Sequence, residues 1–562
     1  MVPTEVFSVM VGGKAGEGVK KAAQVIAHLA MACGKQVFQE DDYQSLIKGG
    51  HNFSIVSIGD RPLWNSYKQH DLIISFDVRS IRLHSLELNP AGMHFCNADD
   101  CASADDRMIR LPMTSLARDS YGPNGNVSLA AVVIFSKVCG LDPDLLERTI
   151  HKEFSRDATG AITYLKKLDF VLNQLDLSPL RSWHQASEPE SKLFSGNQLI
   201  ALGAWAAGLD LYFSYPMTPA SSILHYLALK RDSHKVYSIH AESELAAANM
   251  AIGACFAGKR CAVGSSGGGF ALMQEAFSLA GMVEAPLLCF LSSRPGPATG
   301  VSTYTAQEDL FFALNQGHGE FPRIVASPDS FERAFTLAAE LMDLAWEIQT
   351  PAILLTEKHL SECAANVHLD GHYLPDAPDS LNPEKEDYKR YAITESGVSP
   401  LKFPGCANST DADVIKWNSH EHLESGVRTD AAEQIVAMKN KRKLKAQSLS
   451  LATKRYQRIA SYGEGTTLVF AYGSTALELR EAMKYHPFKL IVPIYLEPFP
   501  EEELEAYRGK EAIIVEHASQ ANFAEFLRIK LGIKAKANIL RYDGRSWDSI
   551  ELAKLIREAE HA

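Results

Sequence analysis

The stretch SYPMTPASS, residues 214–222, is the part of the chain around which the other segments are arranged. It continues the apolar, aromatic run LYFSYP, which predicts a short strand. The strand must end by Pro216 and Pro219, because proline lacks the N–H that a central strand or helix interior needs. Thr218 is therefore expected in a rigid turn directly after a strand.

Two segments further along the chain complete one α/β unit with this turn. Residues 242–257 are dominated by helix-forming residues, and we expect Glu242 and Glu244 in the first turn, where the helix dipole favours carboxylates. The segment CAVGSSGGG, residues 261–269, predicts a strand followed by glycines. Helix and strand patterns alternate from residue 196 to about 357, which predicts a mostly parallel sheet covered on both faces, with ligands beyond the carboxyl ends of its strands.

These segments together resemble the alpha subunit of 2-oxoacid:ferredoxin oxidoreductases, thiamine diphosphate enzymes that oxidatively decarboxylate a 2-oxo acid onto coenzyme A. Four motifs stand in the family's order: YPMTP from Tyr215, AESELAAANMAIGA from Ala241, SSGGG from Ser265 and SRPGPATG from Ser293. Departures from the family pattern are Met217 for Ile, Gly268 for Pro, and Ser293-Arg294-Pro295 for Gln-Arg-Gly. The substrate pocket could therefore differ in detail.

The resemblance assigns roles to residues of these motifs. It implies that Glu244 is the carboxylic acid that activates the aminopyrimidine ring, with Glu242 as second choice, and that Thr218 and Arg294 bind the 2-oxo acid. It implies cofactor contacts at Tyr215, Pro216, Glu242, Ser266 and Gly267. Two plainer interpretations stay open. The glutamates could be only favourable charges in a first helical turn, and Arg294, close to Pro295 and Pro297, could be an ordinary surface loop residue.

The N-terminal region begins with the apolar run VFSVMV, then GGKAGEG at residues 12–18 and an Ala-rich helix pattern. Backbone N–H groups at such a turn can bind a phosphate, so Gly13, Gly16 and Gly18 are candidates for a coenzyme A or other phosphate contact. A tight connection from strand to helix also needs glycine by itself. Further along, Lys48-Gly49-Gly50-His51 is similar to an element of the family's gamma subunit, which implies a gamma domain fused ahead of the alpha part.

The fold class that follows is α/β, with several βα domains. We expect a gamma-like domain at 1–178, a linker at 179–195, a pyrimidine-type thiamine diphosphate-binding domain at 196–365, an irregular connecting segment with a polar helix at 366–460, and a domain resembling the transketolase C-terminal domain at 461–562. Within the connecting segment, Asp430 and Glu433 form a capping-box-like start to a basic helix that runs through MKNKRKLKAQ. That basic run could bind an acidic partner such as ferredoxin, but a solvated helix face is the favoured interpretation.

Composition narrows the classes of partner and compartment. The 562 residues carry a net charge of −12, which argues against nucleic acid or an anionic membrane as the main partner. The apolar runs are all shorter than a membrane span, and the N-terminus lacks the charged region of a signal peptide, so a cytoplasmic protein is expected. The nine cysteines include no CxxC pair, so we expect reduced thiols without a metal or cluster site.

The motif that holds the diphosphate and its metal in the family, Gly-Asp-Gly followed by Asn, is absent from the sequence. The resemblance therefore implies that this chain carries half an active site. A beta subunit would supply the diphosphate-binding fold, Mg²⁺ and a 4Fe-4S cluster, with coenzyme A as cosubstrate, ferredoxin as electron acceptor and an (alpha-beta)2 assembly.

The resulting functional hypothesis is a fused gamma-alpha subunit acting on a 2-oxo acid, best 2-oxoglutarate, giving acyl-CoA, CO2 and reduced ferredoxin. One alternative is a subunit of a non-oxidative thiamine-dependent 2-oxoacid decarboxylase, whose partner would lack cluster cysteines. Another is a nucleotide-binding scaffold that uses only the GGKAGEG turn, which would leave YPMTP and SRPGPATG unexplained.

Overall fold

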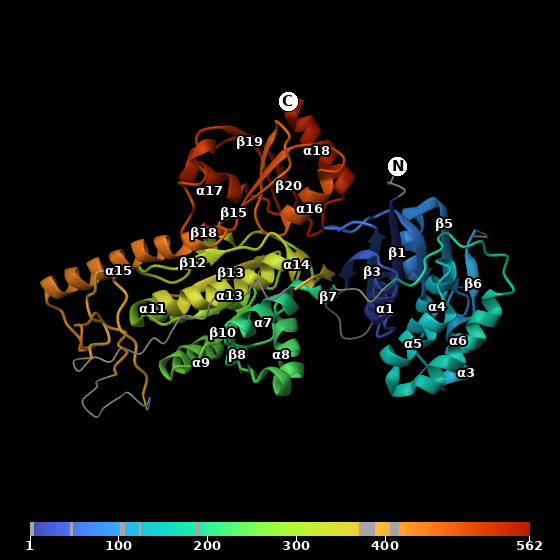
Figure 1. Ribbon diagram of the computed structural model, residues 1–562, viewed down its shortest axis with the longest axis horizontal. Coiled ribbons are helices and arrows are strands. Elements are labelled where there is room, and N and C mark those ends of the chain that lie inside the picture. The colour runs from blue at the N-terminus through green and yellow to red at the C-terminus, as the bar shows by residue number, and fades with distance from the viewer. Residues whose placement is uncertain are drawn as a thin grey trace. The chain divides into compact units, whose positions relative to one another are not determined.

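The computed structural model of the chain describes residues 5–44, 49–101, 107–122, 125–186, 191–369, 388–404 and 415–561, so Lys48 and Cys406 lie outside the described residues (Figure 1). The chain divides into two compact units. The first comprises Met1–Phe194 with Cys363–His368, and the second comprises Ser195–Glu362 with Leu369–Ala562. The eight cysteines that the structure describes are free thiols.

The first unit is built on a mixed sheet with the strand order β6-β5-β4-β1-β3-β2-β14-β7. Its strands are β1 (Val6–Ala15), β2 (Gln36–Asp42), β3 (Gly49–Gly59), β4 (His70–Ser75), β5 (Leu88–Asn97), β6 (Ile109–Leu111), β7 (Lys192–Ser195) and β14 (Ala364–Val367). Its helices are α1 (Val19–Ala32), α2 (Val78–His84), α3 (Met113–Tyr121), α4 (Ser128–Val138), α5 (Pro143–Glu153) and α6 (Ala158–Leu172). The boundary expected at residue 365 falls inside β14, which pairs with β2.

The central strand β1 explains the apolar start of the chain. It lies between β3, antiparallel to it, and β4, parallel to it, and Val6 to Val11 are all buried. A strand covered on both faces reads as a continuous apolar run because both sets of alternating side chains enter a core. The strand extends through Gly12 and Gly13, so Gly13 belongs to β1 and only Gly16 and Gly18 lie in the turn before α1.

The second unit contains a seven-stranded sheet with the order β18-β12-β13-β11-β10-β8-β9. Its strands are β8 (Leu211–Ser214), β9 (Tyr237–His240), β10 (Cys261–Ser265), β11 (Leu288–Ser293), β12 (Ile324–Ala326), β13 (Ala352–Glu357) and β18 (Tyr495–Glu497). Its helices are α7 (Gly196–Ala206), α8 (Ser221–His234), α9 (Glu244–Phe256), α10 (Gly267–Leu272), α11 (Gln274–Val283), α12 (Leu310–Leu314), α13 (Phe331–Ile348) and α14 (Lys358–Glu362).

The expected mostly parallel sheet is confirmed, because β9, β8, β10, β11, β13 and β12 run parallel to one another and only the edge strand β18 is antiparallel to its neighbour β12. Every residue of β10, β11 and β13 is buried, so both faces of these strands are covered. The carboxyl ends of β8, β10 and β11 therefore bring Ser214, Ser265 and Ser293 to the same edge of the sheet.

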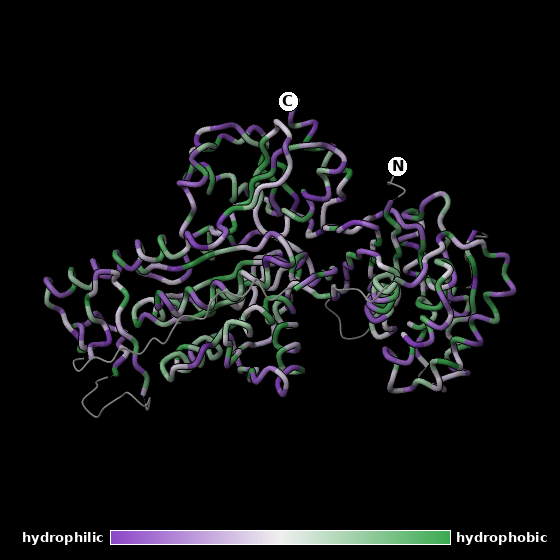
Figure 2. Tube along the Cα trace, in the orientation of Figure 1, coloured by the Kyte–Doolittle hydropathy of each residue, from purple (hydrophilic) through white to green (hydrophobic). Residues whose placement is uncertain are grey.

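A third sheet, also in the second unit, has the order β15-β17-β16-β19-β20. Its strands are β15 (Ile459–Tyr462), β16 (Leu468–Phe470), β17 (Lys489–Pro493), β19 (Glu511–Glu516) and β20 (Lys534–Leu540), with helices α16 (Thr475–Ala482), α17 (Asn522–Leu531) and α18 (Ser549–His561). Figure 2 shows hydrophobic residues along its central strands and hydrophilic residues in its outer loops. The apolar segment 489–497 is divided between two sheets, since β17 stays in this one while β18 pairs with β12 of the seven-stranded sheet.

Helix α15 (Ala432–Ala452) overturns two sequence predictions. Its N-cap is Ala431, without a side-chain cap, so the capping box of Asp430 and Glu433 is wrong. The solvated basic face is wrong for Lys441 and Lys445, whose side chains are buried. Both ammonium groups contact the carboxylate of Glu284, with Lys441 Nζ at 2.7 Å from Glu284 Oε1. Buried charges need such partners, because desolvation of an unpaired ion is very unfavourable.

The ionisation of this buried cluster is set by competing effects. Burial alone raises the pKa of Glu284, but Lys445, Lys441 and Arg390 hold it well below its ordinary value. Burial lowers the pKa of Lys445 to about 7, and Glu284 opposes that shift. The Lys445 ammonium also donates to the carbonyl of Gln349. One carboxylate thus faces three buried cations, and Lys445 is the cation that burial most readily neutralises.

We expect Lys445→Met to change how stability depends on pH. Between pH 7 and about 10 the unfolded chain keeps the Lys445 proton, whereas the folded chain loses it. The contribution of Lys445 to the free energy of unfolding therefore rises with pH, on the order of 1 kcal/mol per pH unit. Chemical denaturation at pH 7, 8.5 and 10 should show a smaller rise in the variant. The exposed control Lys443→Met should behave like the wild type, and an identical rise in all three proteins would contradict the assignment.

Candidate active site

The turn that follows β8 is anchored from two neighbouring elements. Ser214, the last residue of β8, donates from Oγ to the carbonyl of Gly264 in β10 at 2.9 Å. Asn197, near the start of α7, donates from Nδ2 to the carbonyl of Pro219 at 2.8 Å and to Ser222 Oγ at 2.7 Å. The turn expected from its prolines is therefore also fixed by a buried amide, which the sequence pattern did not single out.

Helix α9 begins two residues later than expected. Ser243 is its N-cap and accepts a hydrogen bond from the backbone N–H of Ala246, so Glu244 is the first helical residue. Glu242 precedes the cap and is exposed, so its expected place in the first turn is wrong. Glu244 is only 3% exposed, and its Oε1 has no hydrogen-bond partner within the described residues. The two glutamates thus have opposite environments.

The third glycine of SSGGG is required by the position of Glu244. A Cβ added to Gly269 would lie 2.5 Å from Glu244 Oε1 and would also overlap Ser265 Oγ. Any side chain there would push the carboxyl away, so the glycine allows α10 to approach the start of α9. Ser265 in turn contacts Met217 Sδ through Oγ at 3.8 Å. The Glu244 carboxyl and the turn after β8 are thereby neighbours.

Arg294 directly follows β11 and reaches the same turn. Its Nη1 donates to the backbone carbonyl of Thr218 at 2.6 Å, so the structure joins the two residues through the main chain and not through the Thr218 hydroxyl. The side chain is buried, with 8% exposure, and Nε has no partner within the described residues. The plain interpretation as a surface loop residue is therefore wrong. The Nε and Nη2 edge of the guanidinium is the edge that can bind a carboxylate with two hydrogen bonds.

Asp309 is a half-buried acid beside Arg294 that the sequence analysis missed. Ser293 Oγ donates to its Oδ2 at 2.7 Å, and a Cβ on Gly267 would lie 2.7 Å from its Oδ1. Burial raises the pKa of the Asp309 carboxyl above its ordinary value. Burial lowers the pKa of Arg294, and Asp309 opposes that shift. No pattern in the sequence AQEDL marks this acid, because its contact with Ser293 depends on a loop folding back on the end of β11.

The remaining predicted contacts lie around this centre with different exposures. Ser266 is fully buried, and its Oγ has no partner within the described residues. Gly267 and Pro216 are half-buried. Tyr215 is 40% exposed, and its ring meets His240 edge-on with 6.1 Å between the ring centroids. The structure therefore brings Thr218, Glu244, Ser266, Gly267 and Arg294 to one edge of the sheet and leaves Glu242 at the surface.

The glycine turn of the first unit is held by two carboxylates of the chain. The backbone N–H of Lys14 donates to Glu17 Oε2 at 2.7 Å, and Lys14 Nζ pairs with Asp100 at 2.6 Å. Burial raises the pKa of Glu17. A donor of this turn that could bind a phosphate is thus already bound to a carboxylate of the chain.

Three buried polar atoms without a partner within the described residues mark the site in the second unit as suited to a ligand. They are Glu244 Oε1, Ser266 Oγ and Arg294 Nε. Buried polar groups are normally paired, because leaving one unpaired costs about 1 to 3 kcal/mol. A carboxyl group, a hydroxyl and a guanidinium edge fit a polar heteroaromatic ring together with a carboxylate substrate.

Known proteins show the same combination of domains. A domain family described as pyruvate flavodoxin/ferredoxin oxidoreductase, thiamine diphosphate-binding, matches residues 202–441, and one described as pyruvate ferredoxin/flavodoxin oxidoreductase matches residues 8–163. The 2-oxoacid:ferredoxin oxidoreductase subunit alpha of a Sulfolobus species is 27% identical, over 99% of this chain and 98% of its own. The chain belongs to the 2-oxoacid:ferredoxin oxidoreductase family.

Two further proteins are similar to this alpha subunit, one over about a third of the chain and one over nearly all of it. The 2-oxoglutarate synthase subunit KorA of Archaeoglobus fulgidus is 35% identical over 31% of this chain and 52% of its own. The 2-oxoglutarate:ferredoxin oxidoreductase from Magnetococcus marinus, solved with 2-oxoglutarate, coenzyme A and succinyl-CoA bound, has the same fold, with a TM-score of 0.88, 24% identity, and coverage of 99% of this chain and 100% of that one.

The membership sets the general biochemistry of this alpha subunit. It is a subunit of an oxidoreductase of several subunits and carries a domain of the thiamine diphosphate-binding type. Among the helices of the described residues, none combines the length and the apolar character needed to cross a membrane.

Proposed function

We infer that this alpha subunit provides the aminopyrimidine half of a thiamine diphosphate site and that the assembled enzyme oxidatively decarboxylates 2-oxoglutarate. The products are succinyl-CoA, CO2 and reduced ferredoxin. The observation that carries the inference is the Glu244 carboxyl, buried at the start of α9 with Oε1 lacking a partner within the described residues. Burying such a group is unfavourable unless a ligand completes its hydrogen bonds.

Each residue of the site has a distinct role in this proposal. Thiamine diphosphate, when bound, serves as the electron sink for decarboxylation. Glu244 holds a proton at a ring nitrogen of the aminopyrimidine, while Ser266 and Gly267, with Tyr215 and Pro216, line the cofactor. Arg294 binds the 1-carboxylate of the 2-oxo acid through Nε and Nη2, because Nη1 is already bound to the Thr218 carbonyl. Thr218 orients the substrate from the turn.

The choice of 2-oxoglutarate rests on relatives. The subunit KorA of Archaeoglobus fulgidus belongs to a 2-oxoglutarate synthase, and the enzyme from Magnetococcus marinus was solved with 2-oxoglutarate and coenzyme A. The test is the purified complex of this chain with its partner subunit, assayed for ferredoxin reduction with 2-oxoglutarate and with pyruvate, each with and without coenzyme A. A CoA-dependent preference for 2-oxoglutarate supports the proposal. A preference for pyruvate would refute the substrate, and aldehyde release without coenzyme A would refute the reaction.

The face of α9 next to Glu244 supports a partner that completes the site. Ala247, Ala248 and Ala251 face the core, whereas Leu245 and Met250 are 52% and 45% exposed on the other side. A Cβ on Gly253 would meet no atom within 4 Å among the described residues. Exposed apolar residues beside an incomplete site are typical of an interface. We assign this face to a beta subunit that holds Mg²⁺ at the diphosphate and a 4Fe-4S cluster, in an (alpha-beta)2 assembly.

We expect the chain purified alone to be colourless in the visible region and to bind thiamine diphosphate weakly, because it has neither cluster ligands in a CxxC pattern nor the Gly-Asp-Gly motif. Absorption spectra and titration calorimetry check this. The complex with the partner subunit should show both cluster absorption and tight cofactor binding. A stoichiometric cluster in the chain alone would contradict the assignment.

The glycine turn of the first unit provides a test for coenzyme A. If Gly13, Gly16 and Gly18 contact a phosphate of coenzyme A, the Glu17 carboxylate competes with that phosphate for the Lys14 N–H. We therefore expect Glu17→Gln to lower the KM for coenzyme A by about three- to tenfold, since a like charge near an anion is removed. The KM for the 2-oxo acid should stay constant. An unchanged or raised KM for coenzyme A would show that the turn is only a tight connection.

A further inference from the structure

The loop that begins with Arg294 is held at its start by two acids from its far end. Asp309 Oδ2 accepts a hydrogen bond from Ser293 Oγ at 2.7 Å, directly before Arg294. Glu308 Oε2 accepts one from the backbone N–H of Gly296 at 2.8 Å, two residues after Arg294. The main chain on both sides of Arg294 is therefore fixed by these two neighbouring acids.

Gln307, the residue directly before the two acids, is buried with every hydrogen-bonding position of its side-chain amide occupied. Its Nε2 donates to Glu357 Oε1 at 2.8 Å and to the carbonyl of Tyr472 at 2.9 Å. Its Oε1 accepts from Thr475 Oγ1 at 2.9 Å and from the backbone N–H of His517 at 3.0 Å. An amide offers two N–H donors and an oxygen with two lone pairs, so this side chain is fully paired in one orientation.

The partners of Gln307 come from two sheets of the second unit. Glu357 is the last residue of β13 in the seven-stranded sheet, whereas Thr475 begins α16 and His517 directly follows β19 in the five-stranded sheet. The main chain of Gln307 adds two bonds to the same region. Its N–H donates to the carbonyl of His517 at 2.6 Å, and its carbonyl accepts from the Tyr472 hydroxyl at 3.1 Å. Gln307 therefore fastens the far end of the Arg294 loop to the five-stranded sheet.

We propose that Gln307 is a positioning residue for the 2-oxo acid, which makes the affinity of Arg294 for the substrate carboxylate depend on the packing of the five-stranded sheet. The inference rests on the role of Arg294 in the function proposed above. A guanidinium that is ordered before the substrate arrives loses less conformational entropy on binding. Conversely, a displacement of about 1 Å caused by a distant substitution can lower the rate by about a hundredfold.

The first test is a double-mutant cycle of Gln307→Met and Arg294→Ala, made in the complex of this chain with its partner subunit. Methionine has nearly the same length but no N–H donor and only a weak acceptor. We expect Gln307→Met alone to raise the KM for the preferred 2-oxo acid about tenfold and to change kcat by less than about threefold, because a displaced guanidinium weakens ground-state and transition-state binding alike. In the Arg294→Ala background it should change kcat/KM by less than about twofold. The KM for coenzyme A should stay constant in both backgrounds.

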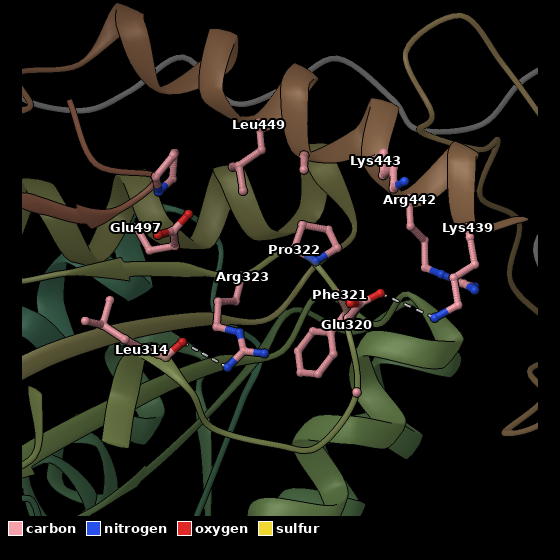
Figure 3. A pocket seen from close by; sticks show the side chains of 13 residues that line it. Leu314, Glu320, Phe321, Pro322, Arg323, Lys439, Arg442, Lys443, Leu449 and Glu497 are labelled. Carbon is pink, nitrogen blue, oxygen red and sulfur yellow. Dashed lines mark hydrogen bonds and ion pairs between the residues drawn. The ribbon is translucent and has the colours of Figure 1, made fainter. Parts of the chain in front are cut away.

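Thr475→Val is a milder second variant, because it removes only one of the hydrogen bonds to Gln307. It should raise the KM for the 2-oxo acid about two- to threefold. The matched control is Thr350→Val, which also removes a hydroxyl from a buried threonine. Thr350 donates to the carbonyl of Pro322, in the wall of a cavity of about 460 Å³ between α15 and the segment that leads into β12 (Figure 3). Because Thr350 precedes β13, it lies at the amino edge of the sheet, opposite the active site, and its loss should leave the KM unchanged.

Equal effects of Gln307→Met in the two backgrounds would overturn the inference, and so would equal KM values for Thr475→Val and Thr350→Val. If Gln307→Met does not assemble with the partner subunit, the two threonine variants decide alone. A failure of the proposed function gives a different result, because Arg294→Ala by itself would then leave kcat/KM unchanged and the inference would be refuted together with the role of Arg294. A preference for pyruvate would refute only the choice of 2-oxoglutarate, since pyruvate has the same 1-carboxylate and the cycle is then measured with pyruvate.

Discussion

Glu244→Gln is expected to leave the complex with the partner subunit assembled and to lower kcat by about a hundredfold or more. Glutamine has nearly the same shape, so its packing against Gly269 is retained, but an amide cannot exchange a proton with a ring nitrogen. Loss of a general acid or base typically lowers the rate by about 10²- to 10⁴-fold, and each factor of ten corresponds to about 1.4 kcal/mol of transition-state stabilisation. Steady-state turnover at saturating thiamine diphosphate measures the effect.

The matched control for this variant is Glu242→Gln, two residues away. Glu242 is exposed ahead of the helix cap, so its loss should change kcat by less than about threefold, a free-energy effect below about 0.7 kcal/mol. A larger loss with Glu242→Gln than with Glu244→Gln would show that Glu244 is not the glutamate that transfers the proton. Equal, small losses in both variants would exclude either residue from the proton transfer.

Arg294→Ala is expected to lower kcat/KM for the 2-oxo acid by at least about thirtyfold. The guanidinium is buried, has Nε free of partners within the described residues, and is placed by its bond to the Thr218 carbonyl. Truncating the charged partner of a bound carboxylate costs about 2 to 5 kcal/mol, and each 1.4 kcal/mol is about a factor of ten in rate, so the lower bound is about thirtyfold. Initial rates over a range of 2-oxoglutarate and pyruvate concentrations give the effect for both substrates.

Two further variants separate the roles of Arg294 and Thr218. Arg294→Lys should recover only part of the loss, because an ammonium keeps the charge but cannot form the paired hydrogen bonds. Thr218→Ala should show a milder loss, because a neutral hydroxyl contributes less than a charge. A loss shared by 2-oxoglutarate and pyruvate locates Arg294 at the 1-carboxylate. A loss confined to 2-oxoglutarate would move it to the distal carboxylate, and no loss with either would remove it from the site.

Local patterns predicted the elements that carry the site. The run LYFSYP ends in prolines and forms β8 and its turn, and the small-residue segment after Glu244 forms α9. The helix nevertheless starts at Glu244 and not at Glu242, because Ser243 accepts the N–H of Ala246 and so fixes the cap. The start of a helix depends on which side chain accepts a hydrogen bond from a backbone N–H two or three residues further on. The amino-acid composition of a segment does not show which side chain does so.

The basic segment of α15 shows where composition misleads. Lys441 and Lys445 occur in the same run as the exposed Lys439 and Lys443, and a basic run is typical of a solvated helix face. Their burial depends on Glu284, which is 157 residues before Lys441 in the sequence. A carboxylate so distant along the chain leaves no periodic signal near the lysines, so only the packed structure reveals the pairing.

The sequence by itself determined the order of strands and helices, the proline-bound turn at Thr218 and the family motifs, because these depend on residues close together in the chain. Only the tertiary structure decided that Arg294 binds the carbonyl of Thr218 across 76 positions, that Asp309 lies beside Gly267, and that Glu244 is buried while Glu242 is exposed. The physical reason is that parallel strands bring their carboxyl ends to one edge, where desolvation and hydrogen bonding between distant segments set the chemistry of each group.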